Sequence, residues 1–307
     1  MTSSAPPREE ADTTRDAGSS RARLIAARAA LGIAAVIVIY LAFVETTVGQ
    51  RFDDAAKLYA VTKQIHYRRY ETLASFGIVV SVVMVVAAHA AWARRGVLSF
   101  AWTAFAVLPP WLLAELGKQT LPRHHLHPTP PWIGSASFPS GHVSITAGCL
   151  LTMVLLAPWA ARRWVTLLAT FTLMASVTLV ITSGMHRPSD VFAAPLLALA
   201  WAGCIAAWTM PARHRWSRAS HAALVGAATL AVIGGAIGSV SFHSEPSGVQ
   251  NLPAQTVINH TLYGAVIVAL AIVVAVGIAA YEMLAPVTLA WADQSPTSSD
   301  SGRTSAV

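Results

Sequence analysis

The stretch FPSGHVSITAGCLLTMVLLAPWA, residues 138–160, joins a polar loop rich in Pro and His to a long apolar run. Pro139 suits the start of a helix because its φ is preset and its missing N–H would have no partner there. Ser140 can cap the first free amides of such a helix, and Gly141 lets a ligand approach the backbone. The stretch therefore predicts a helix whose amino end can hold an anion beside His142. A plain loop-to-helix junction with an incidental histidine is the alternative.

The composition indicates an integral membrane protein. Hydrophobic residues make up 55% and charged residues 11% of the 307-residue chain, whereas a soluble domain carries about 25% charged residues. We attribute the net charge of +7 to loop arginines that set topology and meet anionic lipid, and not to nucleic-acid binding. Cys149 and Cys204 both lie in apolar runs, so no disulfide framework is expected.

Eight apolar segments are long enough to cross a bilayer. They cover residues 24–44, 72–93, 97–117, 139–160, 164–183, 190–210, 221–241 and 258–284. The first is expected to be a retained span and not a cleaved signal, because no small-residue cleavage site follows it. The sequence therefore predicts an all-α fold, a polytopic membrane helix bundle of about eight transmembrane helices.

The expected organisation has four parts. They are a disordered tail at 1–23, a six-helix core at 24–210, two additional transmembrane helices at 211–285 and a second disordered tail at 286–307. Residues 45–70 are polar and are expected to form an aqueous loop, with room for a short amphipathic helix.

Arginine clusters predict the orientation. Arg94–Arg95, Arg162–Arg163 and Arg213–Arg218 each adjoin the end of a span. Cytoplasmic loops carry an excess of Lys and Arg, so these ends and both termini are predicted to be cytoplasmic. The loops 118–137 and 184–189 then face the extracytoplasmic side together. The high alanine content favours a bacterial plasma (inner) membrane.

A second segment with side chains suited to catalysis follows the fifth predicted span. His186 and Asp190 are four residues apart, which places them on one face if a helix begins there. A carboxylate that accepts from one imidazole nitrogen fixes the tautomer and leaves the other nitrogen as a nucleophile or base. Taken alone, the pattern also fits a solvated histidine and aspartate at a membrane surface.

Together with Lys118 and Arg123, these groups would meet on one face and could perform phosphoryl transfer. Cations and helix amides hold the phosphate oxygens, one histidine attacks phosphorus and the other protonates the leaving oxygen. No cofactor or metal is required. A metal site at His124, His125 and His127 is disfavoured, because no Cys or carboxylate lies near them in sequence.

The three segments resemble the three signature motifs of the type 2 phosphatidic acid phosphatase (PAP2) superfamily of membrane lipid phosphatases. These motifs are Lys-x6-Arg-Pro, Pro-Ser-Gly-His and Ser-Arg-x5-His-x3-Asp. Residues 139–142 match the second motif in full, and His186 with Asp190 matches the end of the third. The resemblance covers residues 118–200 in motifs and roughly 24–210 in its six-span layout.

The resemblance implies a role for each matching residue. His186 would be the nucleophile that forms a phosphohistidine, Asp190 would orient it, and His142 would be the general acid. The implied phosphate-binding residues are Lys118, Arg123, Ser140 and Gly141. The implied enzyme is a metal-independent phosphoric monoester or diphosphate hydrolase. Its substrate would be a lipid phosphate of the phosphatidic acid, phosphatidylglycerol phosphate or polyprenyl type, and its partners this substrate and membrane lipids.

The chain departs from the family pattern in the first and third motifs. Four residues, and not six, separate Lys118 from Arg123, and the residue after Arg123 is His124 instead of Pro. Leu179 and Val180 stand where the third motif has Ser-Arg. One expected phosphate-binding cation is therefore missing.

We expect Arg187, or one of His124 and His125, to substitute partly for that cation. Two alternatives stay open. One is a catalytically weakened protein of the same fold that binds anionic lipid or acts as a scaffold. The other is a phosphotransferase that delivers the phosphoryl group to a lipid or sugar.

Overall fold

The structure, a computed structural model, describes residues 27, 30–63, 67–92, 96–128, 137–209 and 253–284. Within these ranges every regular element is a helix. Five helices are long and apolar enough to cross a membrane, and a bent pair of helices gives a sixth crossing if it is counted as one span. The prediction of an all-α polytopic membrane bundle is confirmed.

The described helices follow one another along the chain. They are α2 Thr47–Lys63, α3 Tyr67–Trp92, α4 Val97–Thr120, α5 Gly141–Leu156, α6 Trp159–Thr182, α7 Pro188–Thr209 and α9 Pro253–Leu284, and a helix over Ala30–Phe43 precedes α2. The helices α3, α4, α6, α7 and α9 correspond to five of the predicted spans. The predicted span at 221–241 lies outside the described residues.

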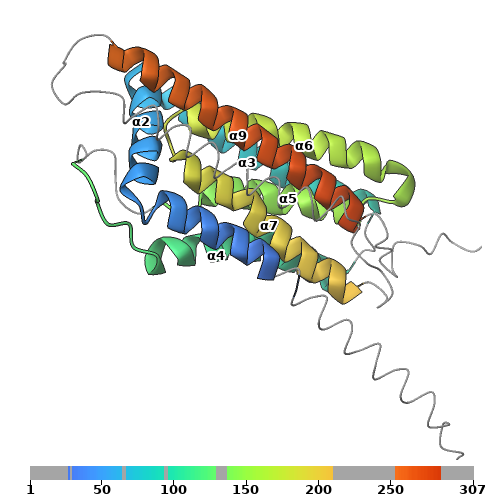
Figure 1. Ribbon diagram of the computed structural model, residues 1–307. Helices are drawn as coiled ribbons and strands as arrows, with labels where there is room; N and C mark the ends of the chain where they lie inside the picture. Colours follow the sequence, from blue (N-terminus) through green and yellow to red (C-terminus); the bar gives the residue numbers. More distant parts are fainter. Residues whose placement is uncertain are drawn as a thin grey trace, which may run out of the picture.

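Helix α5 lies at the centre of the bundle and packs against α3, α4, α6 and α7 (Figure 1). It has 16 residues, too few for the predicted fourth span. Nearly all of its side chains are buried against other helices. A Cβ at Gly148 would lie 2.7 Å from the carbonyl oxygen of Val107 on α4, so this close approach of two helices requires glycine. The packing fixes the position of the amino end of α5.

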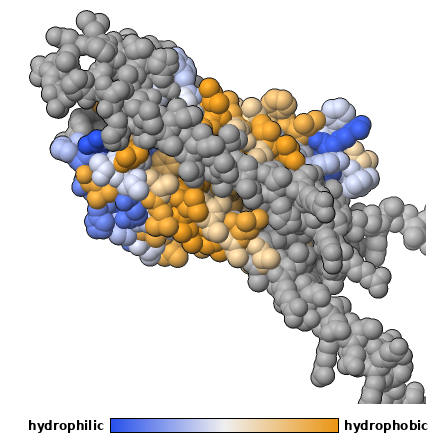
Figure 2. Space-filling model, viewed as in Figure 1, coloured by the Kyte–Doolittle hydropathy of each residue, from blue (hydrophilic) through white to orange (hydrophobic). Residues whose placement is uncertain are grey.

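The outer surface of the bundle is apolar between two hydrophilic ends. Figure 2 shows this hydrophobic band over the described helices. Its large side chains include Phe76 and Val83 of α3, Phe171 of α6 and Ile267 of α9, which are all at least 60% exposed. Exposed apolar surface of this extent is expected where helices face lipid.

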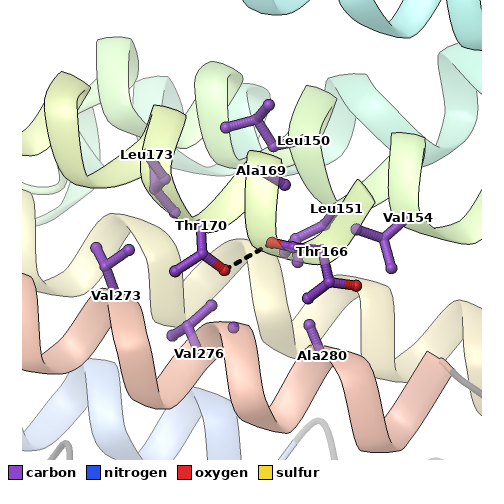
Figure 3. A pocket seen from close by; sticks show the side chains of 11 residues that line it. Leu150, Leu151, Val154, Thr166, Ala169, Thr170, Leu173, Val273, Val276 and Ala280 are labelled. Carbon is purple, nitrogen blue, oxygen red and sulfur yellow. Dashed lines mark hydrogen bonds between the residues drawn. The ribbon is translucent and has the colours of Figure 1, made fainter. Parts of the chain in front are cut away.

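Helix α9 runs along α6 and also contacts α7 and α2. Figure 3 shows a small apolar cavity where α5, α6 and α9 meet. Thr170 on its wall donates to the carbonyl oxygen of Thr166, 2.8 Å away, so the hydroxyl is satisfied within its own helix. At the far end of this contact, buried Arg162 of α6 donates to the carbonyl oxygen of Leu284, the last residue of α9, over 2.6 Å.

Helix α2 corrects the expectation of an aqueous loop at 45–70. The chain bends by 87° after the Ala30–Phe43 helix, and α2 then stands across one end of the bundle (Figure 1). Its Asp53 and Asp54 are 0% and 5% exposed and face the protein interior. These two carboxylates are therefore internal contacts of the fold and do not belong to a solvated loop.

Candidate active site

Three segments that are distant in sequence meet at the end of the bundle where α2 crosses. They are the end of α4, the start of α5 and the turn between α6 and α7. The amide of Ser140 donates to the carbonyl oxygen of Asp190 over 2.9 Å. Position 141 also adjoins the side chain of Lys118, since a Cβ there would lie 3.0 Å from its Nζ. The structure thus brings together the predicted site residues of all three motifs.

The two predicted catalytic histidines face each other. The ring centroids of His142 and His186 are 5.7 Å apart, and the rings are tilted by 61°. His186 is 8% exposed, while His142 is half-buried. A group bound at the amino end of α5 would therefore lie near both imidazoles.

The imidazole of His186 has a carboxylate behind it. Its Nδ1 lies 3.5 Å from Oδ2 of Asp190, which is fully buried. This separation is at the outer limit of a hydrogen bond, and such contacts shorten when a substrate is bound. With Nδ1 turned to the carboxylate, Nε2 is the nitrogen left to attack or accept a proton.

Several donors hold the Asp190 carboxylate in place. Oδ2 accepts from the main-chain amide of Arg187 over 3.1 Å and from the hydroxyl of Ser137. The opposite oxygen, Oδ1, lies 3.6 Å from Nη1 of Arg123. The carboxylate is therefore oriented from the α6–α7 turn and from the two loops that flank it.

Arg123 is bound between two carboxylates. Its Nη2 donates to Oδ2 of Asp53 over 2.5 Å, and its side chain is 2% exposed. Burial alone would lower the pKa of Arg123, but the charges of Asp53 and Asp190 raise it above its ordinary value. The guanidinium stays charged, and it lies behind Asp190 instead of at the surface.

Arg187 also forms an ion pair with a residue of α2. Its Nε donates to Oδ1 of Asp54 over 2.6 Å, and the residue is 1% exposed. His127 approaches the other oxygen of Asp54, with Nε2 3.2 Å from Oδ2. Arg187 stands next to His186 in sequence, yet its guanidinium is turned toward α2.

The most accessible cation of the site is Lys118. Its Nζ forms a 2.7 Å ion pair with Oε1 of Glu115, and the two side chains are 23% and 38% exposed. The Glu115 carboxylate reaches the amino end of α5, because a Cβ at Gly141 would collide with Oε1. A carboxylate thus lies where the sequence predicts that phosphate binds.

The amino end of α5 has the expected cap. The hydroxyl of Ser140 accepts from the amide of Val143 over 3.4 Å. The first-turn amides of a helix have no intrahelical carbonyl to bind, so those of Gly141 and His142 remain as donors for an anion.

Comparison with known proteins places part of the chain in a family. Residues 74–217 match the family model described as PAP2 superfamily. This matched segment, which holds the candidate site, belongs to the PAP2 superfamily. No curated protein and no solved structure matches the chain. The PAP2 match begins within α3 and runs beyond the end of α7, so it includes all three motifs.

The PAP2 fold is generally a phosphatase fold, and one departure of this chain from the PAP2 motifs is visible in its structure. Val180, at the position of the missing arginine, is 0% exposed and belongs to the hydrophobic core. Its position is therefore part of the packing between helices. The cations of this PAP2 site come from elsewhere in the chain.

Sequence reasoning missed the contribution of α2 to this PAP2 site. Asp53 and Asp54 bind Arg123 and Arg187, and Asp53 also accepts from the amide and the hydroxyl of Ser189. A signal was present, because the predicted topology puts residues 45–70 on the same side as the motifs. The adjacent acids Asp53 and Asp54 could therefore have been predicted to pair with Arg123 and Arg187.

Proposed function

We propose that the protein is a membrane-embedded phosphatase that hydrolyses a lipid phosphate or pyrophosphate through a phosphohistidine intermediate. The observation that carries this proposal is the pair of imidazoles at the amino end of α5, 5.7 Å apart, with Nδ1 of His186 facing Asp190. Both histidines and the carboxylate lie in segments that the PAP2 match covers.

The reaction has two steps with balanced atoms. Nε2 of His186 attacks phosphorus with its lone pair, and the bond from phosphorus to the leaving oxygen breaks. His142 gives its proton to that oxygen. Water then attacks the phosphohistidine, His142 takes a proton from the water, and the P–N bond breaks to release inorganic phosphate. Lys118 and the first amides of α5 would offset charge on the phosphate oxygens in both steps.

We place the reaction at the extracytoplasmic face of the plasma membrane, with both termini in the cytoplasm. The arginine clusters at the opposite ends of the spans support this orientation. The apolar outer surface supports delivery of the substrate within the bilayer, with its tail beside the helices and its head group at the site.

Two observations keep other functions in view. The buried Val180 and the carboxylate-bound arginines favour a weakened enzyme that binds anionic lipid or acts as a scaffold. A phosphotransferase would use the same first step and replace water with a hydroxyl acceptor. A scaffold would have no use for two facing imidazoles with a carboxylate behind one of them, so hydrolysis is preferred.

The test is release of inorganic phosphate by the purified full chain in lipid–detergent micelles. The substrates are phosphatidic acid, phosphatidylglycerol phosphate and a polyprenyl mono- and diphosphate. We expect release from at least one of them and loss of release in His186→Ala. The matched control is His89→Ala, which removes an imidazole that lies between α3 and α4 and contacts Thr103.

The intermediate is tested separately. A rapidly quenched reaction with ³²P-labelled substrate should leave acid-labile, alkali-stable label on the wild-type chain and none on His186→Ala. Absence of both phosphate release and labelling with every substrate would contradict the proposed function and favour the scaffold. Transfer of label to a lipid or sugar acceptor in preference to water would favour the phosphotransferase.

A further inference from the structure

Helix α2 supplies the site with a carboxylate that no motif of the sequence contains. Asp53 is 0% exposed. Its Oδ1 accepts from the amide of Ser189 over 3.0 Å, and its Oδ2 accepts from the Ser189 hydroxyl over 2.5 Å. The same Oδ2 accepts from Nη2 of Arg123 over 2.5 Å.

These contacts connect Asp53 to His186 by two routes. The first route passes through Arg123, because Nη1 of Arg123 lies 3.6 Å from Oδ1 of Asp190. In the second, Ser189 is the residue next to Asp190 in the first turn of α7, so fixing its amide fixes the start of that turn. Both routes end at the Asp190 carboxylate, whose Oδ2 faces His186.

We propose that Asp53 is a positioning residue for the reaction, because it holds Arg123 and the first turn of α7 so that Asp190 keeps Oδ2 toward His186. The inference rests on the proposed function. Arg123 is nearer to Asp53 than to Asp190, at 2.5 Å against 3.6 Å. Without the Asp53 charge, the guanidinium closes on Asp190 and competes with His186 for its carboxylate.

A purely structural role is the alternative, since a buried ion pair between α2 and the rest of the fold would also anchor the helix. The two roles differ in what they predict. An anchor changes the amount of folded protein. A positioning residue changes turnover by the folded protein, and it does so only while Asp190 is present to be positioned.

The test compares Asp53→Asn, Asp53→Glu, Asp190→Asn and the double variant Asp53→Asn/Asp190→Asn in the full chain. The readouts are kcat and KM for the substrate on which the wild type is active. The amount of folded protein is measured by size-exclusion chromatography, and kcat is expressed per folded molecule. Asp53→Asn is expected to lower kcat on the order of ten- to a hundredfold with little increase in KM. Asp53→Glu keeps the charge and should recover part of this loss.

The double variant gives the decisive comparison. If Asp53 acts through Asp190, then adding Asp53→Asn to Asp190→Asn lowers kcat by less than about threefold, well short of the product of the two single losses. Arg162→Leu is the control for a lost buried contact, because Arg162 binds the end of α9 at Leu284. It should lower thermal stability without changing kcat per folded molecule.

Each outcome decides the inference. Wild-type kcat in folded Asp53→Asn, or fully multiplicative losses in the double variant, would overturn the positioning role and leave the proposed function intact. If Asp53→Asn does not fold, Asp53→Glu decides: a loss of kcat that disappears in the Asp190→Asn background supports the positioning role, and a loss that multiplies with that of Asp190→Asn overturns it. A wild type that hydrolyses none of the substrates contradicts the proposed function before any variant is compared.

Discussion

Glu115 and Lys118 form an ion pair 2.7 Å long, one turn apart at the end of α4 and directly against the amino end of α5. Lys118, the cation that the PAP2 motif assigns to phosphate binding, is therefore already paired with the carboxylate of Glu115. Under the proposed function, a substrate phosphate would compete with the Glu115 carboxylate for Lys118 at the helix end.

This competition predicts that Glu115→Gln binds phosphate more tightly than the wild type. Removing one negative charge beside the bound anion should lower KM and the inhibition constant of inorganic phosphate by roughly three- to tenfold. Lys118→Gln is the paired variant and should raise both constants. Phosphate inhibition unchanged in Glu115→Gln would show that the anion binds elsewhere.

Gly141→Ala is expected to raise KM without unfolding the protein. Its Cβ would collide with Oε1 of Glu115 and lie 3.0 Å from Nζ of Lys118, so the added methyl group would take room at the helix end where the phosphate is predicted to bind. Gly264→Ala on α9 is the matched control, because a Cβ there meets nothing within 4 Å. Kinetic assays and thermal melts of the two variants should differ in KM only. Equal KM values would contradict the predicted site of binding.

Substitution of His142 should affect substrates according to their leaving groups. An alkoxide leaving group needs the proton of the general acid, so His142→Ala should lower kcat/KM for an alkyl phosphate by about 10²–10⁴-fold. The loss should be much smaller for p-nitrophenyl phosphate, whose leaving group departs without a proton. Equal losses for both substrates would assign His142 to phosphate binding instead of proton transfer.

Val180→Arg should not restore the missing motif cation. Position 180 is 0% exposed and packed in the hydrophobic core, where an unpaired guanidinium is strongly destabilising. The expected result is a lower melting temperature and no gain in kcat/KM, with Val180→Ala as the milder control at about 1–3 kcal/mol. A stable and more active Val180→Arg protein would mean that the family's arginine can reach the phosphate from here.

The role of Arg187 can be separated from its ion pair. Arg187→Met leaves the Asp54 carboxylate buried without its closest cation, which should cost about 3–5 kcal/mol of stability. The double variant Arg187→Met/Asp54→Leu should recover most of that stability, as measured by thermal unfolding. If the double variant also recovers wild-type kcat/KM, then Arg187 does not replace the missing phosphate-binding arginine.

Much of this molecule follows from local sequence patterns. The apolar runs predicted α3, α4, α6, α7 and α9, and Ser140 caps α5 as expected for a residue at a helix start. The spacing of His186 and Asp190 placed both side chains on one face of the α6–α7 turn. These features depend on residues within a few positions of one another or on runs of one composition.

The missed features depend on contacts between distant segments. Asp53 lies 70 positions from Arg123 and 136 from Ser189, and no local pattern states which polar residues of a loop turn inward. Helix α5 was expected to span the membrane because its composition is apolar. Its 16 residues are too few for that span, and its apolar side chains pack against the surrounding helices, which only the structure reveals.

The last described helix, α9, supports the helix that holds two arginines of the candidate site. Helix α9 lies beyond the PAP2 match, yet it rests on α6, α7 and α2, and α2 carries the carboxylates that hold Arg123 and Arg187. During synthesis the three motifs emerge well before α9. A nascent chain should therefore remain catalytically silent until its carboxy-terminal helix has inserted, so that assembly of the bundle itself times the onset of activity.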